Sequence, residues 1–555
     1  MQDHQMGNTS IIHIKDTNPA GTRLVADWQA LMRTFIRPES DTGRPALIKY
    51  MEQILFGLHD FLKTHVGITE EISLKELSER FTDTRISDHP EKKLEHVIVD
   101  LIKGIAPHAV NVASPFFVGH MTSAIPYFMV HLKTIVAALN QNVVKIETSK
   151  LVSIVEKQVL AKIHRLIFNS DDAFYREHVQ NAETALGCFV EDGTLANYTA
   201  LWVARNQLLK PKGDFAGVEQ SGVGAALRSY GIDRCVILAT RFGHFSLNKA
   251  AGLLGIGNEN VIAVDTDAKG RMDPEALDRM IRVLQESGKS TRVMAVVGIA
   301  GTTETGAVDP LDRMADICRK NGIHFHVDAA WGGPTLMSEK YRYLLDGIAQ
   351  ADSVTIDGHK QFYMPMTCGM VFFKDPSALD AVAYYARYVN RPGSVDLGIK
   401  SISGSREANS LVLHSALKIM GSKGYALLIE HSIETAGAFA QEISKRSLFE
   451  LVTPPTLNIL TYRLCPPELR EKLQGGDVKE ARRTARTVNE INIALQRLQR
   501  EAGRSFVSRT TLGGMDSYGE ERVVLRCVIM NPMTTLDTLN AVLDEQEALY
   551  RSHLV

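Results

Sequence analysis

The chain has 555 residues, 45% of them apolar and 23% charged, which is the composition of a globular protein with two or three packed units. Its formal net charge of −2 gives no electrostatic reason to expect a nucleic-acid or anionic-membrane partner. The first residues lack the basic and apolar regions of a signal peptide, and the longest apolar stretch, residues 125–139, contains His131 and Lys133. We therefore expect a cytoplasmic protein without a membrane span.

The cysteines are scattered singly and form no C-x-x-C pair, so neither a zinc site nor a redox motif is indicated. We expect free thiols in a reducing compartment. The six are Cys188, Cys235, Cys318, Cys368, Cys465 and Cys527.

Helical periodicity characterises the first part of the chain. Residues up to about 23 are polar, and from 24 to 103 the pattern is helical, because apolar residues between Leu47 and Leu58 recur at i, i+3 and i+4. One helix face is therefore apolar. We interpret residues 1–113 as a helical N-terminal segment.

Beyond residue 113, short apolar runs alternate with amphipathic stretches of helical length. Several runs have no polar alternation, as expected of strands covered on both faces. This order predicts a mostly parallel α/β sheet over residues 114–405. The expected strands are residues 234–239, 261–264, 293–298, 324–327, 353–356 and 369–373. Helices are expected at residues 273–285 and 312–320.

Residues 406–555 have a different pattern, in which long helices alternate with single strands. Helices are predicted at 410–446 and 477–503, and strands at 458–463 and 523–529. We interpret this part as a smaller α+β domain.

Asp328 follows a predicted buried strand, within the sequence HVDAAWGG at residues 326–333. Open α/β sheets place their ligands at this end of the strands. An ionised carboxylate there can keep a nitrogen of a cofactor ring protonated. The alternative is a carboxylate that caps the next helix.

Lys360 follows the next predicted strand, with His359 before it. An amine desolvated by apolar neighbours is a good nucleophile, whereas the alternative is a solvated lysine at a strand end. The apolar residues that follow are Phe362, Tyr363, Met364 and Met366.

Two further positions suit a cofactor with a flat ring and a phosphate. His244 follows a predicted strand beside Gly243, and its imidazole can stack on a ring, although a lone histidine there is also commonly structural. Gly193 and Thr194 open an apolar helix, and free backbone N–H groups at a helix N-terminus suit a phosphate. A simple helix cap is the alternative for these two residues.

Together these motifs resemble the group II amino-acid decarboxylases that depend on pyridoxal 5′-phosphate (PLP), over residues 115–555. The resemblance implies the PLP-dependent transferase fold type I, which is aspartate aminotransferase-like. It is carried by ordered motifs, namely Pro115-Phe116-Phe117 with Gly119-His120-Met121, Gly193-Thr194 with Asn197, His244-Phe245-Ser246, Ala300-Gly301-Thr302-Thr303 with Gly306-Ala307 and Asp309-Pro310, residues 326–333, residues 353–360, and Asn531-Pro532.

The resemblance also implies roles for individual residues around PLP. Lys360 is expected to form the Schiff base, Asp328 to pair with the pyridinium nitrogen, and His244 to stack on the ring. Thr302 and Thr303 are expected near the ring and its O3′ side. The other cofactor-binding residues that it implies are Gly193, Thr194, Ala330 and His359.

Substrate and loop residues follow from the same resemblance. Arg526 occupies the place of an arginine that binds a substrate carboxylate, and His120 is expected beside the substrate. The alternative for Arg526 is a surface residue at a strand edge. A mobile loop contributes a tyrosine that helps return a proton, and Tyr388 fits the pattern better than Tyr384 or Tyr385. No metal site is expected.

Two departures from the family pattern concern the phosphate and lysine motifs. Animal glutamate decarboxylases have Ser-Pro-Gly-Gly where this chain has Val190-Glu191-Asp192-Gly193. Two acids beside a phosphate repel it unless they point away or meet a cation. The lysine motif is Asp357-Gly358-His359-Lys360 in place of Asn-Pro-His-Lys.

The sequence therefore predicts an enzyme that removes the α-carboxylate of an acidic L-amino acid. The whole chain most resembles bacterial enzymes that convert L-aspartate to β-alanine and CO2 for pantothenate synthesis, and L-glutamate decarboxylation to γ-aminobutyrate is the close alternative. A PLP-dependent C–C lyase and a non-catalytic protein of this fold are alternatives of another class. The family builds its sites at a dimer interface wrapped by N-terminal helices, so we expect a homodimer.

Overall fold

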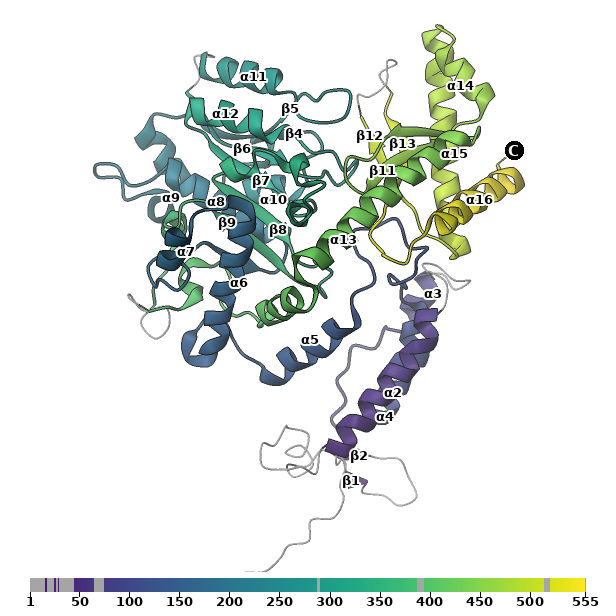
Figure 1. Ribbon diagram of the computed structural model, residues 1–555, viewed down its shortest axis with the longest axis horizontal. Helices are drawn as coiled ribbons and strands as arrows, with labels where there is room; N and C mark the ends of the chain where they lie inside the picture. Colours follow the sequence, from purple (N-terminus) through teal and green to yellow (C-terminus); the bar gives the residue numbers. More distant parts are fainter. Residues whose placement is uncertain are drawn as a thin grey trace, which may run out of the picture. The chain divides into compact units, whose positions relative to one another are not determined.

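The computed structural model describes residues 15–16, 24–25, 28, 44–63, 74–286, 290–386, 394–513 and 520–554 (Figure 1). The chain divides into two compact units. The larger unit comprises Val118–Ile493 and Ser508–Leu543, and the smaller comprises Met1–Phe117, Ala494–Val507 and Asp544–Val555. The domain boundaries expected at residues 113 and 405 stay a prediction.

The larger unit is built around a seven-stranded sheet with the order β3-β9-β8-β7-β6-β4-β5 (Figure 1). Neighbouring strands from β8 through β7, β6 and β4 to β5 are parallel, whereas β9 pairs antiparallel with β8 and with β3. The mostly parallel sheet predicted from the sequence is confirmed. The strands are β3 Gly187–Val190, β4 Arg234–Thr240, β5 Val261–Val264, β6 Thr291–Ile299, β7 His324–Asp328, β8 Ser353–Asp357 and β9 Gly369–Phe373.

Successive residues of these strands enter two different cores, because side chains alternate between the faces of a sheet. In β4, Val236 and Leu238 belong to one buried cluster, and Cys235 and Ile237 belong to the other. The first cluster includes residues of α6 Leu151–Phe168, α11 Pro274–Glu286 and α12 Leu311–Asn321. The second includes residues of α8 Gly193–Leu208, α9 Val218–Tyr230 and α10 Ser246–Leu253. Helices on both faces explain why the strands lack a polar alternation.

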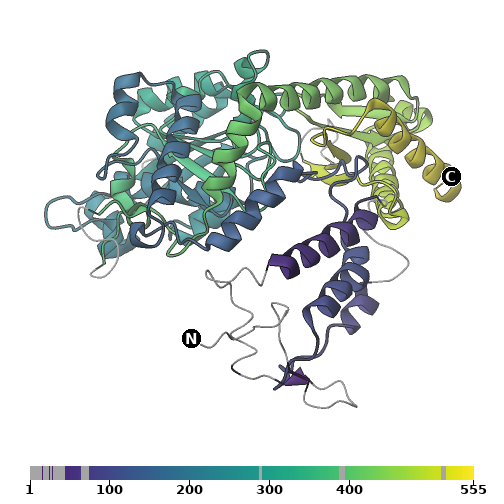
Figure 2. The same cartoon turned by 60° about the horizontal axis from the view of Figure 1, so that its bottom comes forward.

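A second, antiparallel sheet of four strands lies in the same unit, with the order β10-β11-β13-β12. Its strands are β10 Phe449–Thr453, β11 Ile459–Leu464, β12 Ser508–Leu512 and β13 Arg522–Val528. Helix α13, Asn409–Lys445, contacts β10 and β11. The sequence predicted one continuous helix here, but Gly421 has a left-handed φ of 63° that interrupts it, and Figure 2 shows two green segments that meet at an angle.

Further helices occur in both units, and η2 and η3 belong to the smaller one. The longer ones are α5 Tyr127–Leu139, α7 Asp172–His178, α14 Pro467–Gln474, α15 Val478–Ala502 and α16 Leu536–His553. Short helical turns are η2 Leu101–Ile105, η3 Ala106–His108, η4 Ile146–Thr148, η5 Asn258–Asn260, η6 Gly333–Met337, η7 Arg342–Leu345, η8 Ile348–Gln350, η9 Ala378–Val382 and η10 Leu397–Lys400. None of the helices within the described ranges has the length and hydrophobicity that a bilayer crossing requires.

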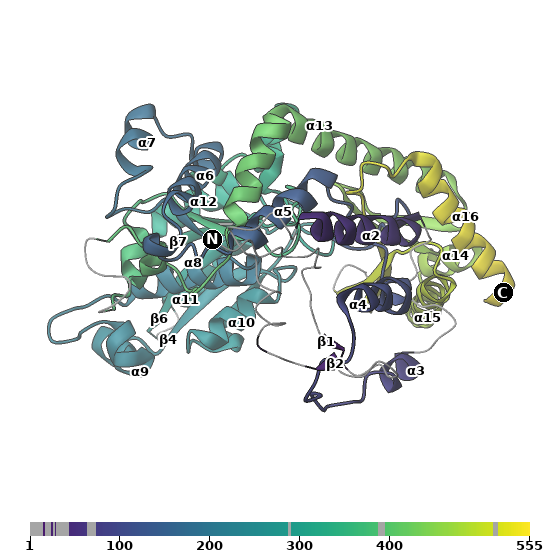
Figure 3. The ribbon, with the colours of Figure 1, turned by 90° about the horizontal axis from the view of Figure 1, so that it is seen from below.

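The smaller unit contains the helices expected near the N-terminus. Helices α2, Arg44–Lys63, and α4, Leu94–Asp100, lie side by side, as Figure 1 and Figure 3 show. The unit also contains α3 Leu74–Glu79 and a pair of two-residue strands, β1 Lys15–Asp16 and β2 Leu24–Val25. On α2, Ile54 is 37% exposed and Leu55 is 47% exposed, so part of the predicted apolar face is open in a single chain.

We predict that Gly347, in the larger unit, tolerates a side chain less well than Gly322. Its φ is +98°, and a Cβ there would overlap the backbone of Asp312 at the start of α12. Gly322 has a φ of +62° with no neighbour near its Cβ, so Gly322→Ala should cost only the left-handed strain of about 1–2 kcal/mol. Gly347→Ala should lower the midpoint of thermal unfolding clearly further. Equal midpoints for the two variants would contradict this account of Gly347.

Candidate active site

A cavity of about 260 Å³ lies at the carboxyl ends of the parallel strands. Asp328 ends β7, Asp357 ends β8 and Ile299 ends β6, and all three side chains line the cavity. This is the edge at which open α/β sheets bind ligands. Most of the site residues predicted from the sequence meet here, namely Gly193, Thr194, His244, Thr303, Asp328, Ala330, His359 and Lys360.

Asp328 is a buried carboxylate that is held by hydrogen bonds. Its side chain is 6% exposed, Oδ2 accepts from Asn197 Nδ2 (2.8 Å), and Oδ1 accepts from the backbone N–H of Ala330 (3.1 Å). Within the described ranges it forms no ion pair with another residue of the chain. A buried carboxylate with neutral donors only is well suited to a cationic ligand group.

A second row of side chains fixes Asn197 behind Asp328. His326 Nε2 lies 3.0 Å from Asn197 Oδ1, and His326 Nδ1 lies 2.9 Å from the hydroxyl of Ser353. Because an amide oxygen only accepts, Nε2 carries the proton of the neutral ring. Burial lowers the pKa of His326 to about 4, so the ring stays neutral at physiological pH. The tautomer in turn orients Asn197 with its amide nitrogen toward Asp328.

Lys360 lies in the turn after β8, where its Nζ is 2.9 Å from Asp357 Oδ2. The lysine side chain is 21% exposed, while that of Asp357 is 3% exposed. Of the apolar residues that follow, Phe362, Tyr363 and Met364 are buried but Met366 is exposed. Lys360 is therefore an amine at the mouth of an otherwise buried pocket, not a freely solvated surface lysine.

Two histidines face the cavity near these carboxylates. Burial lowers the pKa of His244, Asp328 raises it and Lys360 lowers it, so this ring lies within the field of both groups. The backbone N–H of Ser246 donates to His244 Nδ1 (3.3 Å). In His359, Nδ1 lies 2.9 Å from the carbonyl oxygen of Cys368 and 3.1 Å from its backbone nitrogen, and Nε2 lies 3.8 Å from Asp357 Oδ2.

The N-terminus of α8 points into the cavity through Gly193 and Thr194. The carboxylate of Asp192 caps the helix by accepting from the N–H of Leu195 (3.0 Å). A Cβ on Gly193 would lie 2.7 Å from Asp357 Oδ2, so only glycine allows the start of α8 to lie this close to the Asp357 carboxylate. The N–H groups of the first helical residues have no partner within an α-helix and can donate to an anion.

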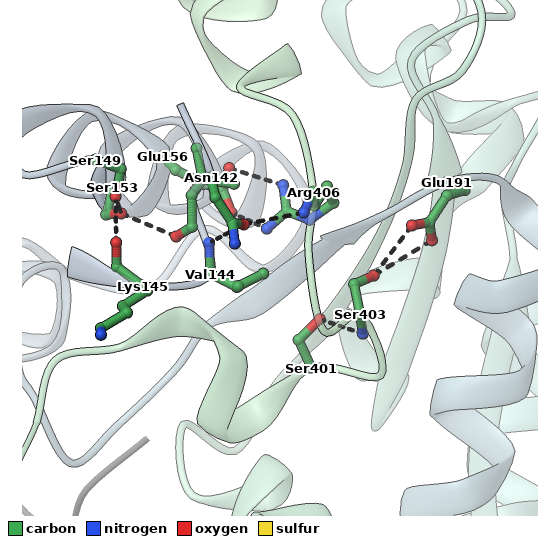
Figure 4. A network of polar contacts seen from close by, with 11 residues as sticks. Asn142, Val144, Lys145, Ser149, Ser153, Glu156, Glu191, Ser401, Ser403 and Arg406 are labelled. Atoms are coloured by element: carbon green, nitrogen blue, oxygen red, sulfur yellow. Dashed lines mark hydrogen bonds and ion pairs between the residues drawn. The ribbon is translucent and has the colours of Figure 1, made fainter. Parts of the chain in front are cut away.

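Glu191, the other acid near this motif, turns toward a different part of the chain. Its carboxylate accepts from the hydroxyl of Ser403 (3.2 and 3.3 Å), and it does not line the cavity (Figure 4). Nearby, the guanidinium of Arg406 forms a bidentate ion pair with Glu156 of α6. The backbone N–H of Arg406 donates to Asn142 Oδ1 (3.1 Å). One of the two acids that the motif contains is thus directed away from the cavity.

The threonine motif forms a tight turn beside the cavity. Thr302 Oγ1 hydrogen-bonds with Thr305 Oγ1 (2.7 Å) and accepts from the N–H of Ala307 (3.1 Å). Thr303 lines the cavity, and its backbone carbonyl accepts from Nε of Arg526. The hydroxyl of Thr302 is therefore engaged within the turn, and Thr303 is the threonine that faces the cavity.

Arg526 lies on β13 between β11 and β12, and its side chain is 6% exposed, so it is not a surface residue at a strand edge. Its Nη1 donates to the carbonyl of Gly119 (3.1 Å) and to Ser508 Oγ (3.2 Å), whereas Nη2 is buried without a partner. Burial lowers the pKa of Arg526 to about 10. The pKa of His120 is lowered by partial burial and by the positive charges of Arg526 and Lys360, so both charges act on this histidine.

The candidate loop tyrosines lie apart from the cavity or outside the described residues. The hydroxyl of Tyr384 donates to Glu219, which raises the pKa of Tyr384 to about 12. Tyr385 lines a second cavity of about 330 Å³ that Lys157 and Lys400 also line. Tyr388 lies outside the described residues, and its role in returning a proton stays a prediction.

Known proteins with similar sequence or structure were compared with this chain. Residues 76–465 match the family model described as the pyridoxal-dependent decarboxylase conserved domain. The chain is 44% identical over 527 residues to an aspartate 1-decarboxylase of Aliivibrio fischeri, with 95% of each chain covered. It is 27% identical to human acidic amino acid decarboxylase GADL1 over 502 residues, which cover 87% of this chain and 89% of the relative. The crystal structure of mouse CSAD in apo form matches with a TM-score of 0.77 and 26% identity, over 91% of this chain and 99% of that one.

A parallel α/β sheet with a lysine, a buried aspartate and a histidine around one cavity at its carboxyl edge defines a PLP-dependent enzyme of fold type I. The chain belongs to the pyridoxal-dependent decarboxylase family. It is a PLP-dependent amino-acid decarboxylase, and the family, fold type and cofactor predicted from the sequence are confirmed.

The residues around the cavity fit each part of PLP. Asp328 offers a buried negative charge for a protonated ring nitrogen, and Lys360 offers an amine. The start of α8 offers backbone N–H groups beside Gly193, where a Cβ would close the approach. Asp357 Oδ1 is buried without a partner and can accept from a bound group. The donor set therefore agrees with the cofactor of the family.

Sequence reasoning missed the residues that position Asp328. Asn197 was noted only as part of a motif, and His326 only as the start of another. The contact of His326 with Ser353 follows from the parallel register of β7 with β8, which pairs these two residues. The contact with Asn197, more than 100 residues away, requires the three-dimensional structure.

We predict that the Arg406–Glu156 pair contributes strongly to stability because both side chains are buried. Glu156→Gln leaves a buried guanidinium without its counter-ion and should cost about 3–5 kcal/mol of unfolding free energy. Glu434→Gln, which removes one partner of the exposed pair with Lys340, is the matched control and should have little effect. Denaturant unfolding of the two variants tests this, and comparable losses would show that burial does not decide the outcome.

Proposed function

We propose that this chain is an α-decarboxylase of acidic L-amino acids and that L-aspartate is its preferred substrate. The reaction gives β-alanine and CO2, with one proton taken up at Cα. The observation that carries the proposal is Arg526, a buried arginine with one free nitrogen in the neighbourhood of Lys360. The similarity to an aspartate 1-decarboxylase and to an acidic amino acid decarboxylase supports the same substrate class.

The chain's own residues would hold PLP by its three distinct parts. Lys360 would bind its aldehyde carbon, Asp328 its ring nitrogen and His244 its ring face, while the N–H groups at Gly193 and Thr194 would bind its phosphate. Bound PLP supplies a protonated ring that accepts the electron pair left when the Cα–carboxylate bond breaks. Asp328 keeps that nitrogen protonated, because its buried charge favours the cationic form.

Arg526 would bind the carboxylate at the far end of the substrate side chain. Its Nε and Nη1 are used by Thr303, Gly119 and Ser508, so only Nη2 is available to a ligand. A single charge-assisted hydrogen bond, not the bidentate grip that a free guanidinium allows, is therefore expected in this arrangement. His120 would lie within the field of both Arg526 and Lys360, since both charges lower its pKa.

The homodimer expected from the family stays a prediction. Exposed apolar side chains support it within each unit. In the smaller unit they include Ile54, Leu55 and Phe56, and in the larger unit Ile135, Leu139 and Leu151.

We predict that Lys360→Ala abolishes the absorbance band of lysine-bound PLP and the decarboxylase activity. The only proposed covalent attachment is then lost, although Asp328 and the start of α8 are intact. Absorbance spectra in added PLP and a CO2-release assay measure both effects. Lys320→Ala, which removes an exposed lysine of α12, is the control and should leave both unchanged. A band that persists in Lys360→Ala would refute the assignment.

The substrate proposal is tested by a decarboxylation screen over L-aspartate, L-glutamate, cysteine sulfinate and 2,4-diaminobutyrate. We expect the highest kcat/KM with aspartate and a lower one with glutamate, because Arg526 is fixed and one extra methylene shifts the distal carboxylate. Arg526→Gln should lower kcat/KM for the acidic substrates by about 100-fold or more, mainly through KM. A preference for glutamate would establish the alternative substrate, and turnover of aromatic amino acids alone would reject both.

A further inference from the structure

Two side-chain atoms at the proposed substrate end are buried and have no hydrogen-bond partner among the residues that the structure describes. They are Nη2 of the buried Arg526 and Oε2 of the half-buried Glu304. Within the described ranges no ion pair joins the two side chains, although the guanidinium is close enough to lower the pKa of Glu304. Unpaired buried polar atoms of opposite charge are uncommon and call for a ligand or a proton.

Glu304 is held at this place by the turn of residues 302–307. The N–H of Gly306 donates to the carbonyl of Thr302 (2.8 Å), and the N–H of Thr302 donates to that of Ala307 (2.9 Å). Gly306 has a φ of +70°, and a Cβ there would lie 2.8 Å from Cβ of Ile459, so the turn is packed against β11. The turn therefore fixes the backbone of Glu304 next to Thr303, whose side chain lines the cavity.

The guanidinium is held by the same turn that carries the acid. The carbonyl of Thr303 accepts from Nε of Arg526, and Gly119 and Ser508 hold Nη1. Glu304 directly follows the residue whose carbonyl binds the guanidinium, and the charge of Arg526 lowers the pKa of Glu304. An anion that reaches Nη2 therefore enters the field of the Glu304 carboxylate.

We propose that Glu304 is a specificity-determining residue that competes electrostatically with the distal carboxylate of the substrate for Arg526. The inference rests on the proposed function, in which Arg526 binds that carboxylate. An ionised Glu304 weakens the attraction of the site for the side-chain carboxylate of the substrate, whereas a protonated Glu304 leaves the charge of Arg526 free and adds an O–H donor. Acidic substrates therefore bind most tightly when Glu304 carries a proton.

The direction of the pH dependence follows from the groups around Glu304. Burial raises the pKa of Glu304, its own backbone N–H lowers it, and Arg526 of β13 lowers it further, with the net shift upward. His120 and Lys360 are the next titratable and cationic groups on the Arg526 side. As pH rises above the ordinary glutamate value of about 4.3, Glu304 ionises progressively and the KM for an acidic substrate rises.

The experiment compares the KM and kcat of wild type and Glu304→Gln with L-aspartate between about pH 5.5 and 8. We expect the KM of Glu304→Gln to be lower than that of wild type by about fivefold at the upper end of this range, and the difference to shrink as the pH falls. The kcat ratio should stay nearly constant with pH, since Glu304 does not touch the reacting atoms. A merely structural role would not produce a KM ratio that depends on pH.

Two matched variants complete the design. Glu304→Asp keeps the charge and should retain a KM that rises with pH, whereas Glu259→Gln removes an exposed carboxylate of η5 and should match wild type. A KM ratio that does not change with pH, or a higher KM in Glu304→Gln, overturns the inference. The second result would show that the Glu304 carboxylate favours the binding of aspartate.

A binding measurement separates this inference from the proposed function. Succinate has two carboxylates and no amine, and its Kd for the holoenzyme can be measured by calorimetry. Tighter succinate binding to Glu304→Gln than to wild type at high pH is expected. If wild type turns over no acidic amino acid, the proposed function fails; if it does but both the succinate Kd and the KM ratio are insensitive to Glu304, only the inference fails.

Discussion

The hydrogen-bonded burial of Asp328 is the constraint on which the site depends. A carboxylate at the end of a central strand is removed from water, and the chain compensates it with Asn197 and the N–H of Ala330 but with no cation in the described residues. Such an arrangement is costly unless a positive group completes it. The neutral His326 behind Asn197 is part of this constraint, because a protonated imidazole would place a second positive charge beside the site of the cofactor nitrogen.

The architecture of the sheet could be predicted from the sequence where burial on both faces dictated the pattern. The apolar runs of β4, β6 and β8 were recognised because helices cover both of their faces. Strand β3, Gly187–Val190, was missed because only two residues separate it from α8, so its apolar run merges with the apolar pattern of that helix. The antiparallel direction of β9 also could not be inferred, since a short buried run looks the same in both directions.

The sequence indicated the position of residues that stand at strand ends, but not of those whose position depends on a distant partner. Asp328 ends a strand of the sheet, and Lys360 and His244 follow two others, so the fold alone brings all three to one cavity, while their roles stay predictions. Glu304 has no such signal. It is one acid in a threonine-rich turn, and its interaction with Arg526 can be recognised only in the structure, where β13 places Arg526 beside that turn. The burial of Arg526 was likewise invisible, because the pairing of β13 between β11 and β12 joins segments far apart in the chain.

In the proposed function, discrimination between substrates of different length would follow from how rigidly the two ends of the site are held. A methylene in an apolar pocket distinguishes substrates only by about 10–200-fold, so a pocket without a fixed anion site would select poorly between aspartate and glutamate. Lys360 on the turn after β8 would set the amine end, and a guanidinium with three hydrogen bonds to the chain would set the anionic end. Because Nη2 could not follow a longer side chain without breaking those bonds, the spacing between the two sheets would determine which substrate length fits. Glu304 would add to this selection, since an anion that fits the spacing imperfectly would gain less from Arg526 but meet the same repulsion.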